Sequence, residues 1–194
     1  MKVVLATTNA GKVREASAIL REVGIEVEVA PMFIGDEENG STYLENARTK
    51  AAAVRRLIGR PVLAEDSGLE VDALAGLPGV RSARFAGSGA TDGENNAKLL
   101  RLLEGMSERT ARYRAVAVLL LPSGAEMVGT GVLEGTIATE PRGTGGFGYD
   151  PIFVPAGESR TAAELTRAEK DAISHRGRAL RQLAERLATR TGGR

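Results

Sequence analysis

The chain of 194 residues has no cysteine and no tryptophan, and it has one histidine. The lack of cysteine excludes disulfide bonds and thiolate metal sites. The sequence also has no apolar run near the roughly 20 residues that a membrane-spanning helix needs. The apolar stretch at its start is far too short for a signal peptide. These absences indicate a cytoplasmic protein with no membrane partner.

The chain also lacks an excess of either charge, because 26 Lys and Arg balance 25 Asp and Glu, for a net charge of +1. Nucleic-acid-binding domains usually carry a positive excess, so we expect no nucleic acid partner. The arginine-rich end of the chain is interpreted as a solvated helix face, and salt-dependent retention on DNA would test the alternative. With 42% hydrophobic residues the chain can bury a sizeable core, and we expect one domain over residues 1–194.

Hydrophobic periodicity predicts helices and strands that alternate early in the chain, followed by a cluster of strands. This order favours an α/β or α+β protein with a mixed sheet flanked by helices. Thr42, with Glu45 three residues later, forms a capping-box pattern that marks the start of a helix. Strands are expected at residues 3–6, 61–64, 115–121 and 126–132, and helices at residues 13–23, about 44–58 and about 174–188.

A polar turn joins the first expected strand to the first expected helix. The free N–H groups at a helix start, together with the charge of Lys12, favour binding of an anion. The spacing is not that of a Walker A loop, so a phosphate cradle and an ordinary capped helix both remain open. The residues of the turn are Thr7, Thr8, Asn9, Ala10, Gly11 and Lys12.

Two acidic pairs could hold a divalent cation. Glu65 and Asp66 follow the second expected strand and precede Ser67, whereas Glu37 and Glu38 lie on a polar loop upstream. Adjacent carboxylates repel each other unless a cation or a proton lies between them. Mg²⁺ prefers carboxylate oxygens and keeps water and substrate phosphates as its other ligands. The alternative is a solvated acidic turn.

Residues 143–153 crowd four glycines around Phe147 and Tyr149, in a chain whose aromatic content is only 4%. Glycines let backbone pass close to a ligand, and flat rings suit a planar ligand such as a nucleobase. The alternative is a tight loop whose aromatic side chains pack inward.

Lys170, His175 and Arg176 place three hydrogen-bond donors in one short segment. Such donors suit a carbonyl-bearing base edge or a phosphate. A lone histidine at a helix start is otherwise a cap or a partly buried polar group.

These motifs occur in order, and the chain resembles the inosine/xanthosine triphosphate pyrophosphatases, the Ham1-like family, almost from end to end. The resemblance implies Mg²⁺-dependent cleavage of the α–β phosphate bond of ITP, dITP and XTP. It also implies an elongated mixed sheet, two lobes with a nucleotide-binding cleft between them, and a homodimer. The shared motifs are residues 8–12, 45–47 with Lys50, 65–68, 76–79, 145–151 and 174–177.

The resemblance further implies roles for single residues. Asp66 would be metal ligand and base for the attacking water, Glu37 or Glu38 would be the second acidic ligand, and Ser67 would contact the substrate. The triphosphate would bind to Thr7, Thr8, Asn9, Ala10, Gly11, Lys12 and Lys50. The base would bind to Phe147, Gly148, Tyr149, Asp150, Lys170, His175 and Arg176.

Two positions depart from the family pattern. Glu65 stands where bacterial members often have Asp, which moves the carboxylate outward by one methylene. Thr8 stands where Gly is common, so its backbone must adopt a conformation open to a residue with a Cβ. Neither change removes a charge or donor that the chemistry requires.

Selection of a 6-oxo purine requires a donor at that edge, from His175, Arg176 or a loop amide. The 6-amino group of adenine would leave this donor unpaired, at a cost of roughly 1–3 kcal/mol. Two other classes remain open. A Maf-like enzyme would prefer pyrimidine or modified triphosphates, whereas a non-enzymatic nucleotide sensor would need no metal ligand or base at Asp66.

Overall fold

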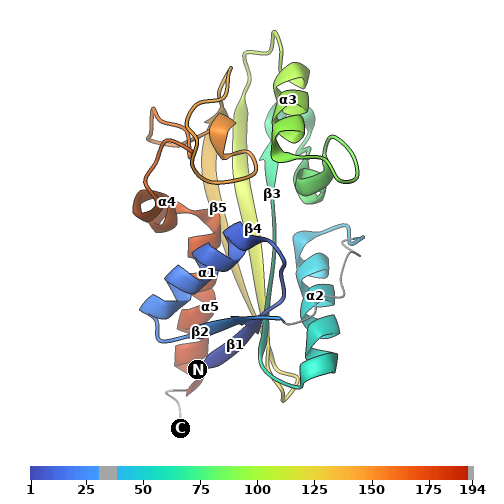
Figure 1. Cartoon of the computed structure of the whole chain (residues 1–194), viewed down its shortest axis with the longest axis vertical. Helices are drawn as coiled ribbons and strands as arrows, with labels where there is room; N and C mark the ends of the chain where they lie inside the picture. The colour runs from blue at the N-terminus through green and yellow to red at the C-terminus, as the bar shows by residue number, and fades with distance from the viewer. Residues whose placement is uncertain (31–38, 192–194) are drawn as a thin grey trace. The chain divides into compact units, whose positions relative to one another are not determined.

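The computed structural model of the chain describes residues 1–30 and 39–191 (Figure 1). The strands are β1 (Lys2–Leu5), β2 (Glu26–Val29), β3 (Val62–Val71), β4 (Thr110–Leu120), β5 (Glu126–Ile137) and β6 (Phe153–Pro155). The helices are α1 (Ala10–Glu22), α2 (Tyr43–Ile58), α3 (Asp92–Leu102), α4 (Arg167–Ile173) and α5 (His175–Thr191). Short 3₁₀ turns lie at Asp72–Leu74, Gly79–Arg84 and Asp150–Ile152.

The strands form one sheet in the order β2-β1-β3-β4-β5-β6. β1 pairs in parallel with β2 and with β3, so that Leu5 lies beside both Val29 and Leu63. β5 and β6 pair in antiparallel fashion. The predicted α/β class with a mixed sheet is therefore confirmed. No helix within the described ranges is long and apolar enough to cross a membrane.

The chain divides into two compact units, each assembled from separate stretches of sequence. The first unit contains Met1–Asp66, Ala115–Gly131 and His175–Arg194, and the second contains Ser67–Arg114 and Val132–Ser174. Each unit has its own apolar core. The single domain over residues 1–194 and the cleft between two lobes stay predictions.

In the first unit, α1 and α5 lie together on one face of the strands and α2 covers the other face (Figure 1). β5 carries Gly129 and Gly131 where it meets α5. A Cβ on Gly131 would lie 2.0 Å from the carbonyl oxygen of His175, and one on Gly129 would lie 2.1 Å from that of Ala179. The two glycines thus let the start of α5 approach the strand, which places His175 and Arg176.

In the second unit, the core contains the fully buried side chains of Leu69, Leu99 and Phe153. The rings of Tyr113 and Phe153 lie with their centroids 4.6 Å apart, in a tilted arrangement. Tyr149 belongs to the same core. The core therefore supports the loop that precedes the 3₁₀ turn at Asp150–Ile152.

The capping box predicted for α2 is confirmed. The Glu45 N–H donates to Thr42 Oγ1 over 3.2 Å, and the Thr42 N–H donates to Glu45 Oε2 over 3.2 Å. The strand expected at residues 61–64 is longer than predicted, since β3 continues to Val71. Charged residues interrupt the apolar pattern after Ala64, but the backbone remains extended through them.

Candidate active site

Glu65 and Asp66 lie within β3 rather than in a turn after it, which corrects the prediction from the sequence. Successive side chains of a strand point to opposite faces of the sheet. Both side chains are buried, with exposed fractions of 5% for Glu65 and 3% for Asp66. The two carboxylates therefore do not share one cation, and each has cationic partners of its own.

Glu65 faces α1 and α5. Its Oε2 lies 2.9 Å from Lys12 Nζ, and its Oε1 lies 3.3 Å from Arg176 Nη2. Arg176 also forms an ion pair with Glu15 of α1. Burial by itself would lower the pKa of the Arg176 guanidinium, but the carboxylates of Glu65 and Glu15 outweigh burial and raise that pKa above its ordinary value. Arg176 is thus a permanent charge that ties α5 to β3 and α1.

Asp66 faces α2. Asn46 Nδ2 donates to its Oδ2 over 2.9 Å, and Lys50 Nζ lies 3.2 Å from its Oδ1. Lys50 Nζ also donates to the carbonyl oxygen of Glu65 over 2.9 Å. Asn46 and Lys50 are four residues apart, so they lie on one face of the helix. The carboxylate of Asp66 is oriented by these two side chains.

The turn before α1 has the geometry of a capped helix start. The Lys12 N–H donates to Asn9 Oδ1 over 3.1 Å, and the Asn9 N–H donates to Thr7 Oγ1 over 3.2 Å. Among the described residues Ala75 is the one non-glycine with a positive φ, so Thr8 has an ordinary backbone. The turn is mostly exposed, and because the cap engages the Asn9 and Lys12 N–H groups, an anion would have to use other N–H groups of the turn.

Residues 143–153, the aromatic loop, contain glycines that mainly make room for other residues of the protein. Gly146 has φ +73°, and a Cβ there would lie 2.1 Å from Asp150 Oδ2. A Cβ on Gly143 or Gly145 would lie 2.7 or 2.8 Å from the carbonyl oxygen of Ala163. Close approach to a ligand was the expectation, and for these three glycines the neighbour is protein. Gly148 differs, because it has φ +63° and open space at its Cβ position.

Asp150 organises the loop from within. Its side chain is 3% exposed, and its Oδ2 accepts hydrogen bonds from Lys170 Nζ at 2.5 Å and from the Phe147 N–H at 2.8 Å. The Lys170 ammonium also lies 4.7 Å from the centroid of the Phe147 ring. Phe147 itself is half-buried. Lys170 and Asp150 therefore hold this ring in place while part of it stays accessible.

Tyr149 packs inward, as the alternative interpretation of the loop allowed. It is 3% exposed, and its hydroxyl donates to the Ser82 carbonyl oxygen over 2.9 Å. Burial raises the pKa of the Tyr149 phenol, and the charge of Asp92 raises it further. The expectation that both rings are offered to a ligand is thus wrong for Tyr149, because the second core takes up this ring.

The predicted site residues fall into two groups, one in each unit. Lys170 lies in α4, whereas His175 and Arg176 begin α5, because the backbone turns extended at Ser174 and ends α4. The first unit holds Thr7, Thr8, Asn9, Ala10, Gly11, Lys12, Lys50, Asp66, His175 and Arg176. The second holds Ser67, Phe147, Gly148, Tyr149, Asp150 and Lys170. The predicted metal ligands Glu37 and Glu38 lie outside the described residues.

The carboxylate of Asp66 suits a metal ion whose other ligands are mostly substrate phosphates and water. Within residues 1–30 and 39–191, no group of three or more acidic or histidine side chains could enclose a metal ion. Mg²⁺ is commonly held by one or two carboxylates plus phosphates and water. A buried carboxylate that neighbouring side chains orient, such as that of Asp66, fits this mode of binding.

Sequence reasoning missed three contributing residues, and it gave no role to a fourth, Asn46, although this residue lies in one of the shared motifs. Glu15 is an acid on the apolar face of α1, and that position signals a buried ion pair. Asn46 lies one turn before Lys50, so helical spacing could have found it. Asp92 and Asn96 contact the aromatic loop from α3 and have no local signal.

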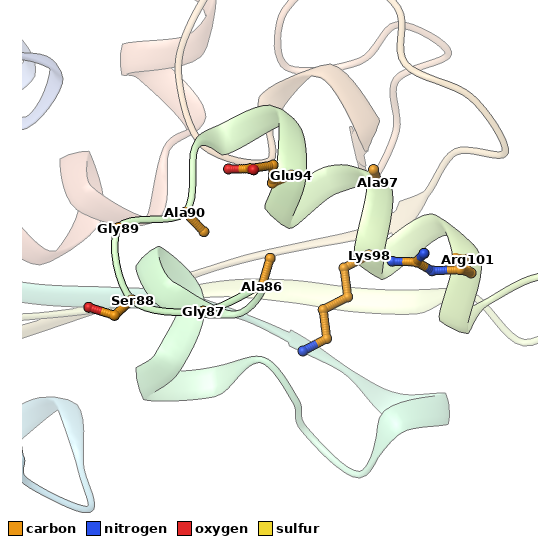
Figure 2. Close-up of a pocket in the computed structure, with 9 residues that line it drawn as sticks. All are labelled: Ala86, Gly87, Ser88, Gly89, Ala90, Glu94, Ala97, Lys98 and Arg101. Carbon is orange, nitrogen blue, oxygen red and sulfur yellow. The ribbon is translucent and has the colours of Figure 1, made fainter.

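The second unit also has an open hollow of about 580 Å³, shown in Figure 2. It is bordered by the loop of residues 86–90 and by Glu94, Ala97, Lys98 and Arg101 of α3. Lys98 Nζ donates to the carbonyl oxygen of Phe85 over 2.6 Å and lies 4.5 Å from the centroid of its ring. None of the predicted site residues that the structure describes borders this hollow.

Relatives of the chain are known across nearly its full length. The chain is 50% identical to a dITP/XTP pyrophosphatase of an Exiguobacterium species, over 94% of this chain and 95% of that protein. It is also 50% identical to a dITP/XTP pyrophosphatase of Shigella flexneri, over 96% of this chain and 98% of that protein.

Solved structures agree with these relatives. A HAM1 protein from Coxiella burnetii is 44% identical with a TM-score of 0.86, and the match covers 97% of this chain and 99% of that one. The Ham1 protein of Staphylococcus aureus is 37% identical with a TM-score of 0.86, over 98% of this chain and 100% of that one. The family model for the Ham1 family matches residues 3–186, and the chain belongs to this family.

Proposed function

We propose that this protein hydrolyses ITP, dITP and XTP to the nucleoside monophosphate and pyrophosphate, which removes noncanonical purines from the nucleotide pool. The observation that carries the proposal is the buried carboxylate of Asp66, oriented by Asn46 and Lys50. This carboxylate occurs in a chain that is 50% identical in sequence to proteins named dITP/XTP pyrophosphatases. An oriented carboxylate next to a lysine suits proton abstraction beside a phosphate.

The chemistry assigned to the first unit is attack by water on the α-phosphorus. Asp66 takes the proton from the attacking water, the new bond forms between the water oxygen and phosphorus, and the bond to the β-phosphate oxygen breaks. Lys12, Lys50 and the N–H groups that begin α1 are assigned to contact the phosphate oxygens, and the remaining negative charge is left to the metal. Pyrophosphate leaves with the electron pair of the broken bond.

The proposal includes Mg²⁺, held by Asp66 and by Glu37 or Glu38. When bound, the ion would neutralise phosphate charge and polarise the reacting phosphoryl group. Asp66 would present its carboxylate to the ion in a fixed orientation, because Asn46 and Lys50 hold that carboxylate. Glu65 does not take part directly, since Lys12 and Arg176 already hold it.

The base is assigned to the aromatic loop. Phe147 offers a half-buried ring for stacking, and stacking of a base on an aromatic ring contributes roughly 1–3 kcal/mol. Gly148 has open space at its Cβ position, so the backbone there is approachable. Asp150 and Lys170 hold the ring. His175 stays a predicted donor to the 6-oxo group.

A product assay tests the proposed function. Purified protein with Mg²⁺ is given ITP, XTP, GTP and ATP separately, and monophosphate and pyrophosphate are measured. We expect pyrophosphate from ITP and XTP, with little from GTP or ATP. Asp66→Asn is expected to lower kcat by roughly 10²–10⁴-fold, the size of a lost general base. Asp72→Asn is the matched control, since this acid pairs with Arg112 at the end of β3.

Other results of this assay would contradict the proposal in different ways. Preference for pyrimidine triphosphates would indicate a Maf-like enzyme. Tight binding of ITP without turnover would indicate a nucleotide sensor. Equal turnover of GTP and ITP would refute the expected discrimination against GTP.

We also propose that the protein acts in the cytoplasm as a homodimer. Leu77, Leu102 and Met106 of the second unit are large apolar side chains with exposed fractions of 41–50%. Exposed apolar side chains favour association when they form a patch. Sedimentation equilibrium should give twice the chain mass of 20.4 kDa. A monomer at micromolar concentration would contradict the dimer.

A further inference from the structure

Gly148 has both of its backbone polar groups held by one helix. Its N–H donates to Asp92 Oδ2 over 2.7 Å, and its carbonyl oxygen accepts a hydrogen bond from Asn96 Nδ2 over 3.1 Å. Asp92 and Asn96 are four residues apart in α3, so they lie on the same face of the helix. Two side chains of α3 therefore hold Gly148 of the aromatic loop by its N–H and its carbonyl oxygen, and this pair of hydrogen bonds is termed the grip.

The two hydrogen bonds from α3 restrain the backbone of Gly148 directly. This glycine has φ +63°, and apart from its two neighbours in the chain no residue comes within 4 Å of its Cβ position. Side-chain packing does not hold it there, so these hydrogen bonds restrain it directly, while Asp150 and the second core hold the residues on either side of it. Gly148 lies between Phe147, whose ring is half-buried, and Tyr149, whose ring is in the core.

The burial of Asn96 supports this interpretation. Asn96 is 7% exposed, and its Oδ1 has no hydrogen-bond partner in the part of the chain that the structure describes. A buried amide is costly unless its polar atoms are satisfied. The bond to the carbonyl oxygen of Gly148 is therefore the interaction that accounts for a polar side chain at this position.

α3 is itself firmly placed. Asn95 accepts a hydrogen bond from the Ala86 N–H over 2.7 Å and donates to the Ala83 carbonyl oxygen over 3.2 Å. Leu99 of the same helix is fully buried in the second core. Asp92 is the first residue of the helix, where a negative charge is favourable. The helix can therefore serve as a fixed support for the loop.

We propose that Asp92 and Asn96 are positioning residues that hold residues 147–149 in the conformation that receives the purine base. The inference rests on the proposed function, because it assigns the loop to the base. It adds a specificity role to residues that touch no substrate. A preformed loop binds its ligand without the entropy cost of ordering.

If this proposal holds, a change at Asp92 or Asn96 affects recognition of the base but not recognition of the phosphates. Loss of the grip should weaken binding of ITP through its base and leave binding of inorganic pyrophosphate unchanged. Each hydrogen bond of this kind is expected to be worth about a two- to tenfold change in affinity. We therefore expect KM for ITP to rise about fivefold in Asp92→Ala and in Asn96→Ala, with a smaller change in kcat.

The experiment compares these variants with two matched proteins. Asp92→Asn keeps an oxygen that can accept the hydrogen bond from the Gly148 N–H. Its KM for ITP should therefore lie within twofold of the wild-type value. Arg101→Ala changes the face of α3 that borders the hollow in Figure 2 and should leave KM unchanged. KM and kcat for ITP and ATP, inhibition by pyrophosphate, and thermal unfolding are measured for all proteins.

The inference is supported if KM for ITP rises in the alanine variants, the preference for ITP over ATP falls, and inhibition by pyrophosphate stays constant. It is overturned if pyrophosphate inhibition weakens equally, or if Arg101→Ala has the same effect. Hydrogen exchange of the Gly148 amide gives a readout independent of activity. Faster exchange in Asp92→Ala but not in Asp92→Asn supports the grip, and unchanged exchange overturns it, even if wild type fails to hydrolyse ITP.

Discussion

Glu65 and Asp66 are neighbours in the chain, yet their carboxylates are held by different helices on opposite faces of β3. Glu65 is paired with Lys12 and Arg176, whereas Asp66 is paired with Lys50. Glu15 also pairs with Arg176, so two acids meet two basic groups on the Glu65 face. On the other face one acid meets one lysine, and the charges of the described residues cancel on each face. An incoming triphosphate would therefore add negative charge that this cluster alone does not compensate.

Metal removal should abolish hydrolysis for this reason. Dialysis against a chelator is expected to lower the rate of ITP hydrolysis by at least about 100-fold, since divalent ions supply several kcal/mol of charge stabilisation. Restoring Mg²⁺ should recover the activity, which is measured as pyrophosphate release. Full activity in the chelated protein would refute the proposed cofactor.

Glu65→Gln should destabilise the first unit. Among the described residues, the substitution removes one of two carboxylates that pair with the buried Arg176 and the one that pairs with Lys12, and breaking a buried ion pair costs about 3–5 kcal/mol. Urea unfolding measures the loss. Glu26→Gln is the control, because its ion pair with Lys2 is exposed and should contribute about 0–1 kcal/mol. Equal effects of the two substitutions would show that Glu65 contributes no more stability than an exposed ion pair.

Gly146→Ala should disrupt the aromatic loop. The new Cβ would lie 2.1 Å from Asp150 Oδ2, at a backbone position with φ +73°. Gly124→Ala meets no atom within 4 Å at φ +86°, so it isolates the backbone strain of roughly 1–3 kcal/mol. We expect a clearly larger loss in thermal unfolding for Gly146→Ala, together with a higher KM for ITP. Matching losses would mean that the Asp150 contact is readily relaxed.

The capping box of α4 should make the helix sensitive to acid. The pKa of Glu169 is lowered to about 2 by hydrogen bonds from the Thr166 side chain and backbone, with a further contribution from Arg160. Because this pKa is lower in the folded state, the stabilisation is present above the ordinary pKa of 4.5 and is lost as the pH falls toward 2. Thr166→Ala should move the carboxyl titration of Glu169, followed by NMR, back toward 4.5. An unchanged titration would refute the role of Thr166.

Local pattern was enough for the parts of this protein that depend on neighbours in the chain. The capping box of Thr42 and Glu45, the polar turn before α1, and the ordered motifs predicted the element types, the mixed sheet and the family. Helical spacing also placed Lys50 on the correct helix. These features depend on backbone periodicity and on side chains a few residues apart, which sequence patterns report directly.

The tertiary structure decided which charges meet and which rings are buried. It placed Glu65 and Asp66 on opposite faces of a strand that continues through them, and it drew Tyr149 into the second core. It also brought Asp92 and Asn96 to Gly148, more than 50 residues away in the chain. Such contacts follow from the crossing of distant segments, and their strength depends on burial, so no local pattern of residue types encodes them.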